Sequence, residues 1–171
     1  MGCSPGDEDC EEYEEPPHEV TLPSFEIMET EVTEAQYEAF TGVDPSLDEN
    51  GGGGSDSPVE NLQGWYVQSF CEQMGARLCT EAEYEYAARG GTTTRYYCGD
   101  DVECLDGIAW YSANSGGHKH DVKGKAPNAY GLYDMLGNVL SWTADYWGEY
   151  GASPAYNPKG PNSGGSLGVR G

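Results

Sequence analysis

The chain has 171 residues, which is enough for one domain with a hydrophobic core. Hydrophobic residues make up 37% of it, and it holds 25 glycines and 13 tyrosines, a composition typical of a loop-rich fold with aromatic anchors rather than a helical bundle. The formal net charge of −22 argues against charge-driven binding to nucleic acid or anionic lipid, and is compatible with a cation or a basic partner.

The first residues are dominated by Glu, Asp, Pro and Gly. We therefore expect residues 1–17 to form an acidic, flexible tether and one domain to occupy residues 18–171. The opening Met-Gly-Cys-Ser looks like the mature end of a bacterial lipoprotein, with a lipid anchor at Cys3 and an extracytoplasmic location, in the cell envelope or secreted. An artefact of cloning or of the gene start would leave a similar trace. No apolar run is long enough to span a bilayer.

Short strands and a long loop are expected in the first third of the domain. Residues 20–22 and 25–27 alternate between apolar and polar side chains, which predicts two short strands broken at Pro23. Residues 43–57 are acidic and contain four consecutive glycines, so we expect a flexible surface loop there.

Three helices are expected, over residues 34–40, 64–74 and 81–89. Thr33 with Gln36 forms a capping box before the first helix, Thr80 with Glu83 forms one before the third, and Gly75 ends the second. The side chains expected to face the core from these helices are Tyr37, Phe40, Trp65, Ser69, Phe70, Met74, Tyr84, Ala87 and Ala88.

The six cysteines favour an oxidising compartment, because an even number in an acidic chain of this kind suggests disulfides. Cys98 and Cys104 enclose a short acidic loop that a disulfide would close. Cys71 and Cys79 flank a helix end and are expected to pair in the same way. A metal thiolate site at Cys98 and Cys104 is the alternative, although no histidine stands near them.

Two histidines stand two residues apart in a loop. His118 and His120 could bind a metal ion, but the sequence offers no third ligand beside them. A solvated loop is therefore the simpler interpretation.

Residues 127–147 are the most aromatic stretch of the chain. Their uneven apolar spacing predicts a buried, turn-rich segment that ends in a strand over residues 139–145. Buried polar groups in such a segment need backbone amides or a bound cation as partners. The oxygen-bearing side chains in question are Asn128, Asp134, Asn138, Ser141 and Asp145.

Several sequence blocks occur in an order that is known from one family. They are V-T-E-A-Q-Y-E-A-F, P-V-E-N, A-R-L-C-T-E-A-E-Y-E-Y-A-A-R-G-G, W-Y-S-A-N-S-G-G, P-N-A-Y-G-L-Y-D-M-L-G-N-V, S-W-T-A-D-Y-W and the final V-R-G. Over residues 18–171 the chain resembles the sulfatase-modifying-factor family, which includes the formylglycine-generating enzyme. The resemblance implies an α+β, C-type-lectin-like fold, rich in loops, with short helices and small antiparallel sheets.

The resemblance also implies structural calcium. One site would use the Asp134 side chain and the backbone carbonyls of Gly137 and Val139, a ligand set that suits a hard cation. The family's remaining ligand is a glutamate at the position that Ser141 occupies here. The loss of that carboxylate should weaken the site.

A second calcium-type site would use Asn114 and the carbonyl of Gly116, with Ala109 offering only its backbone. Turn-forming hydrogen bonds to their own backbone are the alternative role for Asp134 and Asn114.

The activity implied by the resemblance is oxidation of a cysteine in a sulfatase Cys-x-Pro-x-Arg segment to formylglycine, with dioxygen and a copper ion held by two cysteines. In the family these cysteines follow the segment that this chain reaches at Arg170 and Gly171, so none of its residues matches them and the domain is expected to be incomplete at its C-terminus. Two hypotheses remain, a truncated oxidase and a non-catalytic, lectin-like surface protein that binds a protein or peptide. The lipoprotein-like start, the extra cysteines and Ser141 favour the second.

Overall fold

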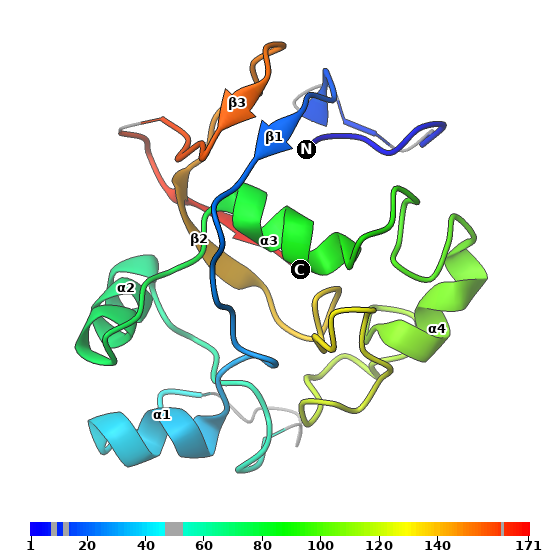
Figure 1. The fold of residues 1–171 in the computed structure, drawn as a ribbon. Coiled ribbons are helices and arrows are strands. Elements are labelled where there is room, and N and C mark those ends of the chain that lie inside the picture. Colours follow the sequence, from blue (N-terminus) through cyan, green and yellow to red (C-terminus); the bar gives the residue numbers. More distant parts are fainter. Residues whose placement is uncertain (8–9, 12–13, 47–52, 162) are drawn as a thin grey trace.

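The computed structural model describes residues 1–7, 10–11, 14–46, 53–161 and 163–171. Short helices alternate with long irregular segments: α1 (Glu34–Thr41), α2 (Gly64–Gln73), α3 (Glu81–Arg89), the 3₁₀ turn η2 (Val102–Cys104) and α4 (Leu105–Ile108). The strands are β1 (Val20–Thr21), β2 (Ser141–Tyr146), β3 (Ala155–Tyr156) and β4 (Leu167–Arg170). Figure 1 shows α3 and β2 in the middle of the molecule, with α1 and α2 on one side and α4 on the other. The mixed α and β architecture agrees with the predicted fold class.

The strands form two sheets of two strands each. β2 and β4 pair antiparallel, with Trp142 opposite Val169, whereas β1 and β3 pair in parallel, which differs from the expected antiparallel sheets. Parallel pairing needs a long crossover, and the chain between β1 and β3 supplies it. β2 begins at Ser141 rather than at Val139, because the Val139 amide donates to a side chain, that of Glu31, instead of a neighbouring strand.

The predicted strand over residues 25–27 does not form. In the described residues no strand lies beside this segment, and its side chains pack inward instead. Ile27 lies against the core, and Phe25 meets the Tyr86 ring edge-on with ring centroids 6.1 Å apart. The segment is therefore held by side-chain packing and not by a ladder of backbone hydrogen bonds.

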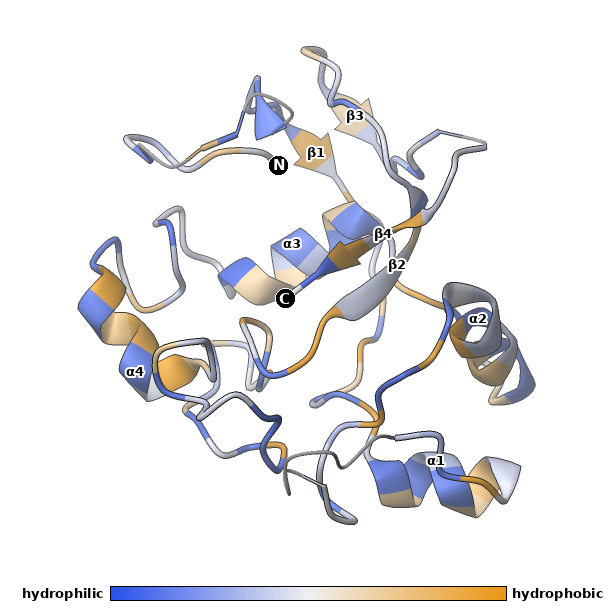
Figure 2. Ribbon diagram, turned by 180° about the vertical axis from the view of Figure 1, so that it is seen from behind, coloured by the Kyte–Doolittle hydropathy of each residue, from blue (hydrophilic) through white to orange (hydrophobic). Residues whose placement is uncertain are grey.

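The hydrophobic core lies between α3 and the segment before β2. Tyr84 and Ala87 of α3 pack against Leu132 and Met135, and the Tyr84 hydroxyl donates to the Met135 carbonyl at 3.0 Å. That bond satisfies the one polar atom of a buried tyrosine ring. In Figure 2, which shows the molecule from behind, α3 lies against β4 and β2.

The start of α3 is fixed from three directions. The predicted capping box is present, since Thr80 accepts from the Glu83 amide and Glu83 accepts from the Thr80 amide. The Arg77 guanidinium also donates two hydrogen bonds of 2.7 Å to the buried Glu83 carboxylate. On β2, Asp145 accepts from the Glu81 amide at 2.6 Å, which joins the strand to the helix N-terminus.

The outward faces of α1 and α2 differ from the prediction. Tyr37 and Phe70 are buried against each other, with ring centroids 4.9 Å apart, and the capping box of Thr33 with Gln36 is present. Other side chains that were expected to face the core are exposed, namely Phe40, Trp65, Ser69 and Met74. The two helices lie at the edge of the molecule, so only the faces that meet each other or the centre are covered (Figure 1).

The N-terminal residues lie against α3. Arg89 donates to the Gly2 carbonyl at 2.7 Å and to the Ser4 hydroxyl at 2.9 Å, and the Met1 amine donates to the His18 carbonyl. The expected tether thus has an anchored beginning, while the boundary at residue 17 stays a prediction.

The predicted loop at 43–57 lies partly outside the described residues. Its described end is bonded to α1, where the Glu34 amide donates to the Ser57 carbonyl at 2.9 Å.

The Asp145 carboxylate gives this fold a testable pH dependence. Burial raises its pKa to about 6, above the value of about 3.9 for an unfolded chain. The native state therefore binds more protons between these values, so the contribution of Asp145 to stability falls as pH rises from about 4 to about 6. Asp145→Asn keeps an acceptor for the Glu81 amide but cannot ionise. We expect the variant to gain stability over the parent as pH rises from 4 to 7, measured by urea unfolding.

The exposed Asp44→Asn serves as the control for the loss of one negative charge. The opposite trend for Asp145→Asn would show that the ionised carboxylate stabilises the helix N-terminus more than burial penalises it.

Candidate functional site

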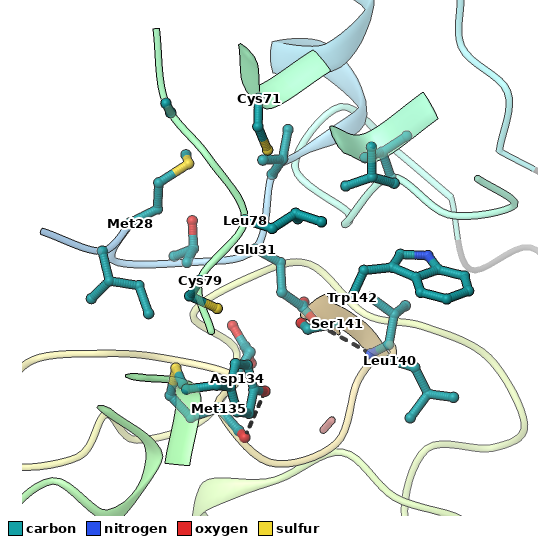
Figure 3. Close-up of a pocket in the computed structure, with 18 of the residues that line it drawn as sticks. Met28, Glu31, Cys71, Leu78, Cys79, Asp134, Met135, Leu140, Ser141 and Trp142 are labelled. Carbon is teal, nitrogen blue, oxygen red and sulfur yellow. Dashed lines mark hydrogen bonds between the residues drawn. The ribbon is translucent and has the colours of Figure 1, made fainter. Parts of the chain in front are cut away.

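A cavity of about 1170 Å³ opens between the segment before α1, the inner side of α2 and the start of β2. Its walls are mostly apolar and include Ile27, Val67, Leu78, Trp142 and Val169. Figure 3 shows side chains from these separate segments around one space. The cavity is somewhat larger than most ligand pockets and has the apolar lining that is typical of them.

Acidic groups are prominent in the polar part of this cavity, which also includes Arg77 and neutral polar side chains. Glu31 and Asp134 both line it, together with Ser141. Glu31 accepts hydrogen bonds from the Val139 amide at 3.2 Å and from the Asn138 side chain at 3.0 Å. Burial, reinforced by the negative charge of Asp134, raises the pKa of Glu31 to about 8. Burial thus favours the neutral form of both carboxyl groups, and pKa values perturbed in this way are common at functional sites.

Asp134 has one satisfied and one unsatisfied carboxylate oxygen. Its side chain is buried, with Oδ2 accepting from the Lys123 amide at 2.8 Å, while Oδ1 is buried and has no hydrogen-bond partner. Burial raises the pKa of Asp134, against the effect of the Lys123 bond. A buried, unpartnered carboxylate oxygen fits a cation ligand, because the charge is otherwise uncompensated.

The backbone beside Asp134 is tightly constrained. Gly137 has a φ of +80° and forms a parallel bridge with Trp110, and a Cβ on it would lie 2.1 Å from the Trp110 carbonyl oxygen. No other residue fits this position. Of the expected ligands Asp134, Gly137 and Val139, the structure brings Asp134 to the cavity with an open oxygen and holds the neighbouring backbone rigid.

Sequence reasoning missed Glu31. It stands two residues before the Thr33 N-cap, just ahead of the block V-T-E-A-Q-Y-E-A-F, and its neighbours gave no sign that a carboxylate would be buried there. An acid between the apolar Ile27 and Val32 was the only available signal, and it is a weak one.

The second predicted calcium-type site is organised by hydrogen bonds. Asn114 accepts from the Tyr111 amide at 2.9 Å, and its amide nitrogen donates to the Ala109 carbonyl at 3.0 Å and to Asp106 at 3.3 Å. No atom of the Asn114 side chain is left without a partner. A cation at Asn114 and Gly116 stays a prediction, and the structure supplies no unsatisfied atom in its favour.

The cysteines pair differently from the prediction. The Cys98–Cys104 disulfide is confirmed, but Cys71 and Cys79 are free, and Cys3 pairs with Cys10 instead. Cys71 belongs to α2, whereas Cys79 lies beyond the helix end, against the core beside α3, so flanking the helix end in sequence does not bring them together. Both thiols line the cavity. Burial raises both thiol pKa values, that of Cys79 to about 11, which keeps them protonated at neutral pH.

The two histidines take part in ring stacking. The His120 ring stacks on Trp110 at 3.7 Å, with its Nε2 2.9 Å from the Ser115 carbonyl oxygen, and the His118 ring lies 5.0 Å from that of His120. Among the described residues, the group of three His, Cys, Asp or Glu side chains close enough to share a metal ion is Cys3, Cys10 and Glu14. Because its two sulfurs are bonded to each other, this group is not a thiolate site as it stands.

In the described part of the chain, no helix is both long and apolar enough to cross a membrane.

The chain belongs to the sulfatase-modifying-factor family, because a family profile described as "Sulfatase-modifying factor enzyme 1-like domain" matches residues 1–170. It is similar to the serine/threonine-protein kinase pkn1 of Chlamydia pneumoniae, with 38% identity over 112 residues, 63% of this chain and 17% of the kinase. The formylglycine-generating enzyme of Mus musculus is 35% identical over 125 residues, 64% of this chain and 33% of the enzyme. An "Inactive C-alpha-formylglycine-generating enzyme 2" of Bos taurus is 34% identical over 100 residues, 53% of this chain and 33% of that protein.

A solved structure supports the fold. Treponema denticola variable protein 1 superposes with a TM-score of 0.83 and 31% identity, over 91% of this chain and 75% of that one. The chain spans a third or less of the length of the three relatives above. Similarity to these proteins therefore establishes the family and the fold of this chain. It does not assign their activities to it.

Peptide mapping without reduction tests the cysteine assignment. We expect Cys3–Cys10 and Cys98–Cys104 linked, and Cys71 and Cys79 alkylated once the protein is unfolded. In the native protein at pH 8, alkylation of Cys79 should be much slower than in the unfolded chain, because its thiol is protonated and partly covered.

A Cys71–Cys79 linkage, or rapid native labelling of Cys79, would contradict the assignment. The same map decides the state of Cys3, because a sulfur that is bonded to Cys10 cannot also carry a lipid thioether. The predicted lipid anchor and the disulfide exclude each other in any one molecule.

Proposed function

We propose that this chain is a non-catalytic member of the sulfatase-modifying-factor family that works outside the cytoplasm as a binding scaffold. The observation that carries the proposal is the state of its cysteines. Four are in disulfides, and the two free ones are protonated thiols on different segments. Copper-dependent oxidation needs two thiolates for a soft Cu(I) ion, and the six cysteines of residues 1–171 do not supply such a pair.

The cavity is the binding site in this proposal. Its apolar walls offer area for aliphatic or aromatic side chains, while Glu31 and Asp134 add negative charge on the inner side. A protein or peptide segment with apolar side chains and no excess of acidic ones fits this chemistry. Nucleic acid does not fit, because a chain of net charge −22 repels phosphates. The disulfides support an oxidising compartment.

A structural calcium ion at Asp134, with the carbonyls of Gly137 and Val139, is part of the same proposal. Its support is the buried Oδ1 atom of Asp134 that no protein group satisfies. When bound, the ion would supply positive charge that holds the turn before β2 together. It takes no part in a reaction.

An oxidase is the second candidate, and one observation favours it. Cys71 and Cys79 both line the cavity that also holds Trp142, so a substrate cysteine in the cavity would meet free thiols (Figure 3). Their raised pKa values and their positions on separate segments argue for the scaffold instead.

Incubation of the chain with a Cys-x-Pro-x-Arg peptide, copper, reductant and dioxygen distinguishes the two candidates. We expect the peptide mass to stay unchanged, with the mouse formylglycine-generating enzyme as the positive control. Conversion of the peptide cysteine to an aldehyde would overturn the scaffold proposal. Loss of that conversion in both Cys71→Ser and Cys79→Ser would then assign it to these thiols.

Calcium should stabilise the fold through Asp134. After treatment with EDTA, added calcium chloride should raise the Tm of the parent chain, and Asp134→Asn should lose most of this rise because it keeps the shape but not the charge. Thermal scans at constant ionic strength measure the effect. The matched control is the exposed Asp44→Asn. An equal rise in Asp134→Asn and parent would place the ion elsewhere.

A further inference from the structure

Two tyrosine rings lie against each other at the surface, where α3 meets the segment before β2. The ring centroids of Tyr86 and Tyr130 are 5.7 Å apart with an interplanar angle of 30°, and the Tyr130 hydroxyl donates to the Tyr86 hydroxyl at 3.3 Å. Among the described residues, no other tyrosine pair combines a ring contact with a hydrogen bond between hydroxyls. The two residues are 53% and 47% exposed, so a reagent in solution can reach both.

Contacts near the core hold both rings in place. Tyr86 belongs to α3, and the Phe25 ring packs against it edge-on with centroids 6.1 Å apart. On the other side, the buried Asn128 accepts from the Tyr130 amide at 2.9 Å and donates to the Ala87 carbonyl, next to Tyr86, at 2.6 Å. One buried side chain therefore ties the turn that carries one ring to the helix that carries the other.

Phenols that meet through their hydroxyl edges are well oriented for oxidative coupling. Tyrosyl radicals couple through the ring carbons on either side of the hydroxyl-bearing carbon. Because the hydroxyls of Tyr86 and Tyr130 are in hydrogen-bond contact, these carbons lie along the facing edges of the two rings, and a small rotation of the rings brings them together. Such an arrangement turns an encounter of two chains into a step within one chain.

We propose that Tyr86 and Tyr130 are a modification site, at which an oxidant of the peroxidase and hydrogen peroxide class joins the two rings in a dityrosine cross-link. Each phenol loses one electron and one proton to become a phenoxyl radical. A carbon–carbon bond then forms between the rings, and the hydrogen on each bonded carbon moves to its oxygen, which restores both phenols. One hydrogen peroxide takes up the two electrons and two protons and becomes two water molecules.

The cross-link would connect α3 to the segment before β2 across a separation of 44 residues. A covalent link of this kind restricts the unfolded chain and so stabilises the folded one. Neither tyrosine lines the cavity, so this modification is independent of what the cavity binds. An oxidising compartment, which the two disulfides favour, is compatible with such an oxidant.

Treatment of the dilute chain with a peroxidase and limiting hydrogen peroxide tests the proposal. We expect the mass of the monomer to fall by two hydrogen atoms, dityrosine fluorescence to appear, and peptide mapping to link the peptides that carry Tyr86 and Tyr130. The yield per chain should not depend on protein concentration, and at low ionic strength the net charge of −22 disfavours contact between two chains. A short tyrosine peptide in a parallel reaction shows that the oxidant is active.

Two conservative variants and one control locate the reaction. Tyr86→Phe and Tyr130→Phe should each lose the cross-link completely, because coupling needs two phenols. Tyr156→Phe removes a more exposed hydroxyl, on a residue that is 72% exposed, and should couple as the parent does. Oxidation should also raise the Tm of the parent and of Tyr156→Phe, and should not raise that of the other two variants.

Three results would overturn the proposal. The first is a parent chain that does not couple while the tyrosine peptide does. The second is a linkage at other tyrosines, or a product found only as a dimer of two chains, since exposure alone would then decide where coupling occurs. The third is a cross-link that persists in Tyr86→Phe or in Tyr130→Phe. None of these results bears on the scaffold proposal, which the sulfatase-type peptide assay decides.

Discussion

The fixed start of α3 is the constraint on which the rest of the structure depends. Glu83 is almost fully buried, and its carboxylate simultaneously closes the capping box at Thr80 and accepts both arms of Arg77. Asp145 reaches the same helix end from β2. The chain has little regular structure to impose order, so this junction sets where α3, β2 and the core side chains between them lie. The cavity is a consequence of that placement, because its walls come from the segments that these contacts hold.

Burial of charge recurs through this chain and is resolved in different ways. Glu83 is compensated by Arg77, and Glu34 by Lys119, which is itself buried. Glu31 and Asp134 have no such partner among the described residues. In a chain with 30 acidic and 8 basic side chains, carboxylates outnumber the cations that could neutralise them. An external cation at the cavity would therefore complete a pattern of pairing that the chain carries out elsewhere with its own residues.

The disulfide-bonded cysteines and the free cysteines of this chain lie in different places. The two disulfides close short loops at Cys3–Cys10 and Cys98–Cys104, away from the cavity lining, whereas the two thiols at the cavity are partly covered and protonated. Four of the six cysteines thus form local cross-links. The scaffold interpretation follows from that division rather than from any relative's activity.

Local features could be predicted from the sequence. The capping boxes at Thr33 and Thr80, the extent of α3 and the close disulfide Cys98–Cys104 depend on residues only a few positions apart, so the sequence alone determined them, and the ordered blocks determined the family. Tertiary structure decided the rest. Which side of α1 and α2 faces outward, the failure of residues 25–27 to form a strand, and the separation of Cys71 from Cys79 depend on what packs nearby. Glu31 shows most clearly what the sequence alone could not predict. Its buried place in the cavity depends on Asp134 and Val139, which only the folded chain brings near it.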